Sequence, residues 1–99
     1  MGFNVISKPT LKGFWEDHAD SKEALETWFK LLTKSEATNF SELKKTFGSA
    51  DYVQPDYAIF DIKGNTYRVI TRVNFTYKTF WIKHIFTHAE YSKWKPAKE

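Results

Sequence analysis

The first half of the chain carries hydrophobic side chains at the spacing typical of helices. A helix is predicted to begin between Ser7 and Thr10, and its apolar face consists of Leu11, Phe14 and Trp15. A second stripe repeats at i, i+3, i+4 and i+7, and it is formed by Leu25, Trp28, Phe29 and Leu32. Asp20 followed by Glu23 is typical of a capping box and is expected to begin this second helix.

Two shorter elements complete this half. A third helix is predicted over about residues 39–47, with Asn39 as its N-cap and Glu42 at the reciprocal position of a capping box. Gly48 is expected to end that helix in the left-handed conformation that glycine adopts easily. Residues 3–7 are predicted to form a first short strand.

The second half changes to the pattern of strands. Residues 57–62, 67–73 and 79–86 are rich in β-branched and aromatic side chains, which favour extended structure. Residues 63–66 and 74–78 are predicted to be the turns between these strands. A further short strand near Tyr52 and Val53 is expected to pair at an edge. Helices followed by strands predict an α+β fold, with helices on one face of a largely antiparallel sheet and the other face left open.

Side chains alternate across a strand, and this assigns the two faces of residues 67–73. Tyr67, Val69, Thr71 and Val73 are expected to face the helices, which places Arg68 and Arg72 on the open face. In the last strand both alternating sets are largely apolar, so its two faces stay unassigned. The open face is where functional residues are expected.

Composition bounds the remaining possibilities. A chain of 99 residues is expected to form one domain over residues 1–99, and a hydrophobic content of 41% is enough for a folded core. The absence of cysteine excludes disulfides and thiolate metal sites. No apolar run is long enough to cross a membrane, and no secretion signal precedes the first strand. The protein is therefore expected in the cytoplasm, without a membrane partner.

The charge of the chain is uneven. Residues 1–50 carry seven lysines and seven acids, whereas residues 57–98 carry eight Lys or Arg side chains and two acids. Both arginines lie in this second half. A basic half of this kind fits a polyanionic partner such as nucleic acid, although a solvated charged surface would show the same pattern.

Several kinds of chemistry are disfavoured by the residues present. His84 and His88 are four residues apart, and on a strand that spacing separates them by about 13 Å, too far for one metal ion. No serine stands in a nucleophile elbow, and no glycine-rich phosphate loop is present. The sequence therefore predicts neither a metal nor another cofactor.

Chemistry that uses Lys, Arg, His, Tyr and a hydroxyl of the substrate remains, and RNA carries such a hydroxyl at each ribose. Histidine is the side chain whose ordinary pKa is nearest neutrality, so His88 suits an acid or a base, and Arg68 can grip a phosphate through two N–H groups. Lys63 can add positive charge, and Tyr91 can donate a proton or stack on a base. Each residue also has a plain structural interpretation, as a solvated lysine, a surface histidine or a packing tyrosine. Arg72, Lys83 and His84 are expected to contact the RNA beside these four.

Three blocks of sequence carry a resemblance to a known family. Residues 4–16, the segment from Phe60 to Arg68, and the closing segment from Thr87 to Tyr91 are together similar to the HigB toxins of the RelE superfamily. The resemblance extends over about nine-tenths of the chain, and the tail from Trp94 onward lies beyond it. Asp61 stands where some RelE relatives have a further lysine, which leaves the cationic cluster thinner.

The resemblance implies a RelE-like fold and a metal-independent endoribonuclease that cleaves mRNA in the ribosomal A site. It implies that Lys63, Arg68 and His88 are catalytic, and it supports a catalytic role for Tyr91 less strongly. It also implies neutralisation by a HigA-type antitoxin with a helix-turn-helix, through which alone operator DNA would be contacted. Two other functions fit the same pattern: a non-catalytic inhibitor of DNA gyrase, as in fold-mates of the ParE type, and a basic RNA-binding module.

Overall fold

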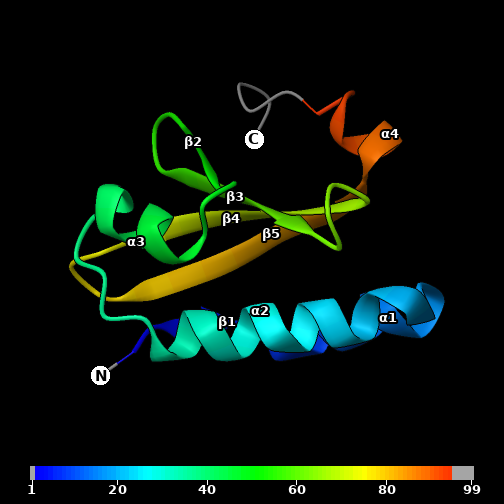
Figure 1. The fold of residues 1–99 in the computed structure, drawn as a ribbon, viewed down its shortest axis with the longest axis horizontal. Coiled ribbons are helices and arrows are strands. Elements are labelled where there is room, and N and C mark those ends of the chain that lie inside the picture. The colour runs from blue at the N-terminus through cyan, green and yellow to red at the C-terminus, as the bar shows by residue number, and fades with distance from the viewer. Residues whose placement is uncertain (1, 95–99) are drawn as a thin grey trace.

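The amphipathic helices and the alternating strands of the chain meet in layers, as Figure 1 shows. The computed structural model describes residues 2–94. Its elements in chain order are β1 (Asn4–Ile6), α1 (Lys8–Asp17), the 3-10 turn η1 (Ala19–Ser21), α2 (Lys22–Lys34), α3 (Phe40–Thr46), β2 (Asp51–Val53), β3 (Tyr57–Ile62), β4 (Tyr67–Asn74), β5 (Thr79–Thr87) and α4 (His88–Tyr91). The α+β class predicted from the sequence is confirmed.

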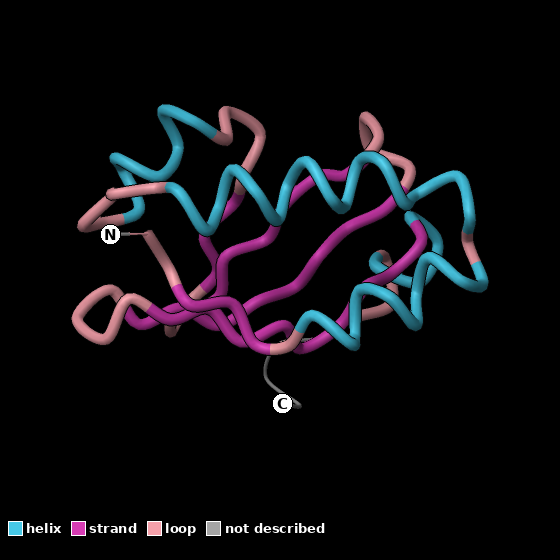
Figure 2. Tube along the Cα trace, turned by 90° about the horizontal axis from the view of Figure 1, so that it is seen from below, coloured by secondary structure: helices cyan, strands magenta, loops and turns pink. Residues whose placement is uncertain are grey.

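The strands of residues 2–94 form a sheet in the order β1-β5-β4-β3-β2. Neighbouring strands run antiparallel except β1, which lies parallel to β5. A parallel pair needs a crossover, and here the chain between β1 and β5 includes the helices α1 and α2, which lie across one face of the sheet (Figure 2). The short edge strand near Tyr52 is also confirmed, because β2 pairs with β3 at the edge of the sheet.

The main core lies between the helices and the sheet. Leu25, Trp28 and Leu32 of α2 are buried against Phe60 of β3 and Phe80 of β5. Burying one such side chain stabilises the fold by about 1.5–3 kcal/mol before the entropy of ordering it is subtracted. The residues of β4 predicted to face the helices are all buried, and they are Tyr67, Val69, Thr71 and Val73.

Two predictions about helix ends were wrong. Asp20 does not cap α2, because it lies inside the 3-10 turn and no side chain caps that helix at Ser21. Gly48 is not left-handed: α3 ends at Thr46, the amide of its C-cap Phe47 donates to the Leu43 carbonyl, and the chain turns without a positive φ there. The Asn39 cap of α3 is confirmed, since its side chain accepts from the amide of Glu42. The reciprocal bond predicted for Glu42 is not formed, because its carboxylate accepts from the amide and the hydroxyl of Thr38 instead of from the Asn39 amide.

A bulge in β5 decides which side chains share a face. Along β4 and β5, Ile70 pairs with His84 but the next residue, Thr71, pairs with Ile82, so Lys83 is the extra residue. An extra residue reverses the alternation beyond it. Phe80 therefore faces the helices on one side of the bulge and Ile85 on the other, while His84 faces away from them.

The face predicted to be open is covered in part. Tyr57, Ile59 and Ile70 are buried there in a second cluster, against which Tyr91 of α4 and Trp94 pack. In Figure 1 α4 lies on the side of the sheet away from α1 and α2. The cover forms because three adjacent apolar side chains on that face would otherwise remain in water. Within residues 2–94, no helix has the length and apolar character needed to cross a membrane.

Candidate functional site

Arg68 occupies the centre of the site, on the face of the sheet away from α1 and α2. It stands directly opposite Asp61 across β3 and β4, and its Nε lies 3.1 Å from the Asp61 Oδ1. The two atoms form an ion pair although their alignment does not meet that of a hydrogen bond. The side chains keep only 15% and 19% of their surface exposed, so the charge of Arg68 is held in place and balanced by a neighbouring carboxylate.

Helix α4 covers the other side of this arginine. The guanidinium carbon of Arg68 lies 4.7 Å from the centre of the Tyr91 ring, a cation–π contact. The helix begins with a complete capping box, in which the Thr87 hydroxyl accepts from the amide of Glu90 and the Glu90 carboxylate accepts from the amide of Thr87. This box fixes where β5 ends and where Tyr91 is presented.

His88 is the first residue of α4, and its side chain is exposed. Its backbone amide donates to the Thr66 carbonyl at 3.2 Å, which ties α4 to the turn between β3 and β4. His88 and Tyr91 are three residues apart on one helical turn, so their side chains are neighbours on the same side of it. The structure therefore brings Arg68, Tyr91 and His88 to one end of the sheet.

Lys63 is held elsewhere. Its Nζ lies 2.9 Å from Oδ2 of Asp20, and the other carboxylate oxygen accepts from the hydroxyl of Tyr67 at 2.7 Å. Tyr67 belongs to the core between helices and sheet, so the ammonium of Lys63 lies on the helix side, across the sheet from Arg68. The Lys63 and Asp20 side chains are 48% and 50% exposed, and water screens the pair.

The bonds around Asp20 shift two pKa values. The hydrogen bond from Lys63, followed by that from Tyr67, holds the pKa of Asp20 below its ordinary value. The same contact raises the pKa of Tyr67, because the carboxylate favours the protonated phenol and burial adds to the effect. Tyr67 is also fixed edge-on by the rings of Phe14 and His18 from α1 and its C-cap.

Arg72 lies four residues further along β4 on the same face as Arg68. Its Nε lies 2.7 Å from Oδ1 of Asp56, and its guanidinium stands over the ring of Tyr57 at 5.1 Å. Tyr57 faces Arg72 directly across the strands. The arginine is thus ordered by one carboxylate and one ring, in the same manner as Arg68.

The two remaining candidates are in β5. His84 stacks on Phe86 with ring centres 4.8 Å apart, and Trp94 stands edge-on to it at 6.4 Å. Lys83 is the bulge residue and is exposed. The face around Arg68 is therefore a surface where cations alternate with rings, the pattern that suits stacked bases and phosphates.

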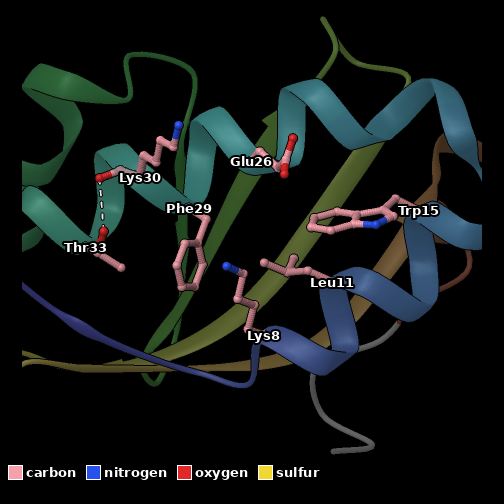
Figure 3. A pocket seen from close by; sticks show the side chains of 7 residues that line it. All are labelled: Lys8, Leu11, Trp15, Glu26, Phe29, Lys30 and Thr33. Carbon is pink, nitrogen blue, oxygen red and sulfur yellow. Dashed lines mark hydrogen bonds between the residues drawn. The ribbon is translucent and has the colours of Figure 1, made fainter.

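A separate hollow lies in the helix layer (Figure 3). Leu11 and Trp15 of α1 point toward Phe29 of α2, and the cavity between them has a volume of about 150 Å³. It is on the opposite side of the sheet from Arg68, and none of the predicted site residues lines it. Among the described residues no group of three or more His, Asp or Glu side chains could hold a metal ion.

Some contacts of the site were not predicted from the sequence. The capping box of α4 could have been recognised, because Thr87 and Glu90 have the required spacing. The opposition of Asp61 and Arg68 follows from a four-residue turn at residues 63–66 and could also have been found. No sequence signal connects Asp20 to Lys63, or Trp94 to Tyr57, because each pair is distant along the chain.

Comparison with known proteins adds the family. The mRNA interferase HigB of Escherichia coli O6:H1 is 28% identical to this chain over 92 residues, which are 91% of this chain and 89% of that protein. The HigB toxin family, described as the RelE-like toxic component of a toxin–antitoxin system, matches residues 21–94, which include α2, the strands β2–β5 and the whole Arg68 site. Since that match covers well over half of the sequence, the chain belongs to the HigB toxin family.

Proposed function

We propose that this HigB-family toxin is an endoribonuclease that cleaves messenger RNA and thereby stops translation. The observation that carries the proposal is the setting of Arg68, whose guanidinium is ordered against Tyr91 while His88 stands one helical turn away. The relative from Escherichia coli is named an mRNA interferase, which agrees with this activity. Its toxin–antitoxin family implies an antitoxin partner.

The proposed reaction needs no metal. A base removes the proton of a ribose 2′-hydroxyl, and the oxygen attacks the neighbouring phosphorus. The bond from phosphorus to the 5′ oxygen of the next nucleotide breaks, and an acid protonates that oxygen. The products are a 2′,3′-cyclic phosphate and a 5′-hydroxyl, with no net gain or loss of protons. Such proton transfers accelerate a reaction by about 10²–10⁴-fold when the groups are well placed.

Each candidate has a proposed part in this reaction. Arg68 binds the non-bridging phosphate oxygens, and phosphate then competes with Asp61 for the guanidinium. His88 transfers a proton. Tyr91 orders Arg68 through its ring, and its hydroxyl is a second group that can transfer a proton. Lys63 contributes charge only if its ammonium leaves Asp20, a change that the exposure of this pair makes inexpensive.

The RNA is proposed to extend from this centre along the same face. Arg72, Lys83 and His84 are the contacts there, with Arg72 and His84 held in position by Tyr57 and Phe86 respectively. Ordered cations beside rings bind single-stranded RNA without requiring a particular base.

The cellular setting is part of the proposal. The substrate is messenger RNA in the ribosomal A site, in the cytoplasm where translation takes place. A HigA-type antitoxin with a helix-turn-helix neutralises the toxin, and operator DNA is contacted through that antitoxin alone. The family and the HigB relative support messenger RNA as the substrate and an antitoxin as the partner. The A site, the HigA type of the antitoxin and the operator contact are extensions of the resemblance in sequence.

The decisive experiment has two arms: free labelled mRNA is incubated with the purified protein in EDTA, and the same mRNA on translating ribosomes is incubated with it in Mg²⁺ without EDTA. Cleavage that persists in EDTA and leaves cyclic phosphate ends is expected, and it should be faster on translated message. Cleavage that EDTA abolishes would overturn the metal-free mechanism. If induction of the gene arrests growth with DNA breaks and intact mRNA, the gyrase-inhibitor reading replaces the nuclease.

A further inference from the structure

Five side chains form one row across the whole sheet, on the face that carries Arg68. Strand register aligns them from edge to edge, each paired with the next. The members of this cross-sheet row are Val53, Tyr57, Arg72, Trp81 and Ile6. Arg72 is the member of this row in β4, and it is four residues from Arg68, a distance of about 13 Å in an extended strand.

Trp81 shares this face because of the bulge at Lys83. In a regular strand Trp81 would point to the opposite side from His84, three residues later. The extra residue reverses the alternation, so that Trp81 on one side of the bulge and His84 on the other both face away from α1 and α2. Bulges of this kind commonly redirect a side chain toward a site.

Trp81 differs from other tryptophans of the chain in its exposure. Trp28 is buried in the core, and Trp94 packs against Tyr57 and His84. Trp81 leaves 38% of its surface in water, and its neighbour Ile6 leaves 42%. Because Ile6 and Trp81 are paired in register, their exposed surfaces form one apolar patch beside Arg72.

The chemistry beside Trp81 identifies the partner. Arg72 is opposite it in register, and Asp56 and Tyr57 hold that guanidinium in place. An exposed indole next to an ordered cation matches one nucleotide, whose base stacks and whose phosphate is negative. We propose that Trp81 is a stacking platform for a base that flanks the cleaved bond, with Arg72 binding an adjacent phosphate. This inference rests on the proposed function.

The test measures binding of fully 2′-O-methylated single-stranded RNA, which cannot be cleaved by its own 2′-hydroxyl. Trp81→Leu keeps an apolar contact for Ile6 but removes the ring, and the Kd should rise about fivefold to a hundredfold, as loss of one stacked base predicts. Trp81→Phe should recover most of that loss. Tyr77→Leu is the matched control, because Tyr77 is 76% exposed in the turn after β4 and outside the row; its Kd should equal that of the unmodified chain.

A second arm identifies the nucleotide. Abasic substitutions are placed one at a time along the RNA, and each is measured with the unmodified chain and with Trp81→Leu. One position should weaken binding to the unmodified chain yet have little further effect in Trp81→Leu, because the two changes remove the same contact. RNA shortened past that position should bind both chains equally. Thermal unfolding of each variant verifies that it is folded.

The outcomes separate the inference from the function it rests on. If the unmodified chain binds and cleaves RNA while Trp81→Leu shows the same Kd and the same abasic profile, the platform is wrong and the nuclease stands. If Trp81→Leu binds RNA normally but loses affinity for the antitoxin, the row is an antitoxin surface and the inference is overturned. If the unmodified chain neither binds nor cleaves RNA, the proposed function fails first.

Discussion

Asp61 and Arg68 face each other across two strands, with Oδ1 and Nε 3.1 Å apart and both side chains more than four-fifths buried. A carboxylate in this position balances the cation that the proposed reaction needs. Phosphate must therefore displace Asp61 or share the guanidinium with it. If Arg68 binds phosphate as proposed, this pair couples the stability of the fold to the affinity for RNA.

Asp61→Asn should consequently destabilise the free protein and tighten its binding of RNA. Breaking a fully buried pair costs about 3–5 kcal/mol, and the remaining exposure together with the Tyr91 ring should reduce this to about 2 kcal/mol. Urea unfolding with and without 2′-O-methyl RNA measures both effects. An Asn variant that is less stable but binds RNA no better would show that Asp61 does not compete with phosphate.

Arg68→Lys keeps the charge of Arg68 and loses its planar fork. Lysine cannot form two parallel bonds to a phosphate or stack flat on the ring of Tyr91. Cleavage should therefore fall about a hundredfold, which corresponds to about 3 kcal/mol of transition-state stabilisation, and Arg68→Ala should fall at least as far. Single-turnover rates at saturating RNA give the comparison. Full activity in the lysine variant would mean that charge alone is sufficient.

The strands were predictable because their β-branched and aromatic runs allow no competing helix. Predicted bounds of 57–62, 67–73 and 79–86 compare with Tyr57–Ile62, Tyr67–Asn74 and Thr79–Thr87. The faces of β5 were not predictable, because both of its alternating sets are apolar and the bulge at Lys83 has no sequence signal. The placement of Arg68 followed from alternation along β4 alone.

The position of Lys63 shows where sequence reasoning ends. Its partner Asp20 is 43 residues away in the chain, and Tyr67, whose hydroxyl donates to the same carboxylate, is 47 residues from Asp20. Local patterns indicated a capping role for Asp20, whereas the tertiary contact assigns it to the turn of β3 and β4. Long-range pairs of polar groups leave no periodic trace, so only the folded arrangement reveals them.

The Asp20 cluster should make stability depend on pH. In the folded chain the pKa of Asp20 lies below 3.8, its ordinary value, which we take for the unfolded chain. Between the folded and the unfolded pKa, the unfolded chain therefore binds more protons than the folded chain. The stabilisation is present at neutral pH and is lost as the pH falls through that window. Asp20→Asn should be less stable than the unmodified chain at pH 7, and the gap should narrow near pH 3.

Urea midpoints at the two pH values measure that gap. Tyr67→Phe is the matched control, since it removes one of the two hydrogen bonds to Asp20 and leaves the pair with Lys63. The difference in urea midpoint between Tyr67→Phe and the unmodified chain should also become smaller in acid, but by less than the difference for Asp20→Asn. A gap for Asp20→Asn that is equally wide at pH 3 would place its effect in packing instead of charge.

Two tryptophans on one face should respond differently to truncation. Trp94 packs against Tyr57 and covers the cluster with Ile59 and Ile70, so Trp94→Ala should cost about 2–3 kcal/mol, less than a fully buried tryptophan. Trp81→Ala removes a side chain that is 38% exposed and only partly buried, so it should cost less than Trp94→Ala, about 1–2 kcal/mol. Chemical denaturation of both variants gives the values. Equal losses of unfolding free energy in the two variants would contradict the view that Trp94 covers the cluster while Trp81 remains available to stack on a base.

His88 gives the sharpest test of the proposed chemistry. Its side chain is exposed and its structural bond is made by the backbone, so His88→Gln should fold with unchanged stability and retain its affinity for 2′-O-methyl RNA. Loss of a proton-transferring group should slow cleavage by about 10²–10⁴-fold. Single-turnover cleavage and RNA binding are measured on the same preparation. A His88→Gln variant that cleaves at the normal rate would transfer the proton-transfer role to Tyr91 or Lys63. Tyr91→Phe, which keeps the ring over Arg68 and loses the hydroxyl, would then distinguish these two.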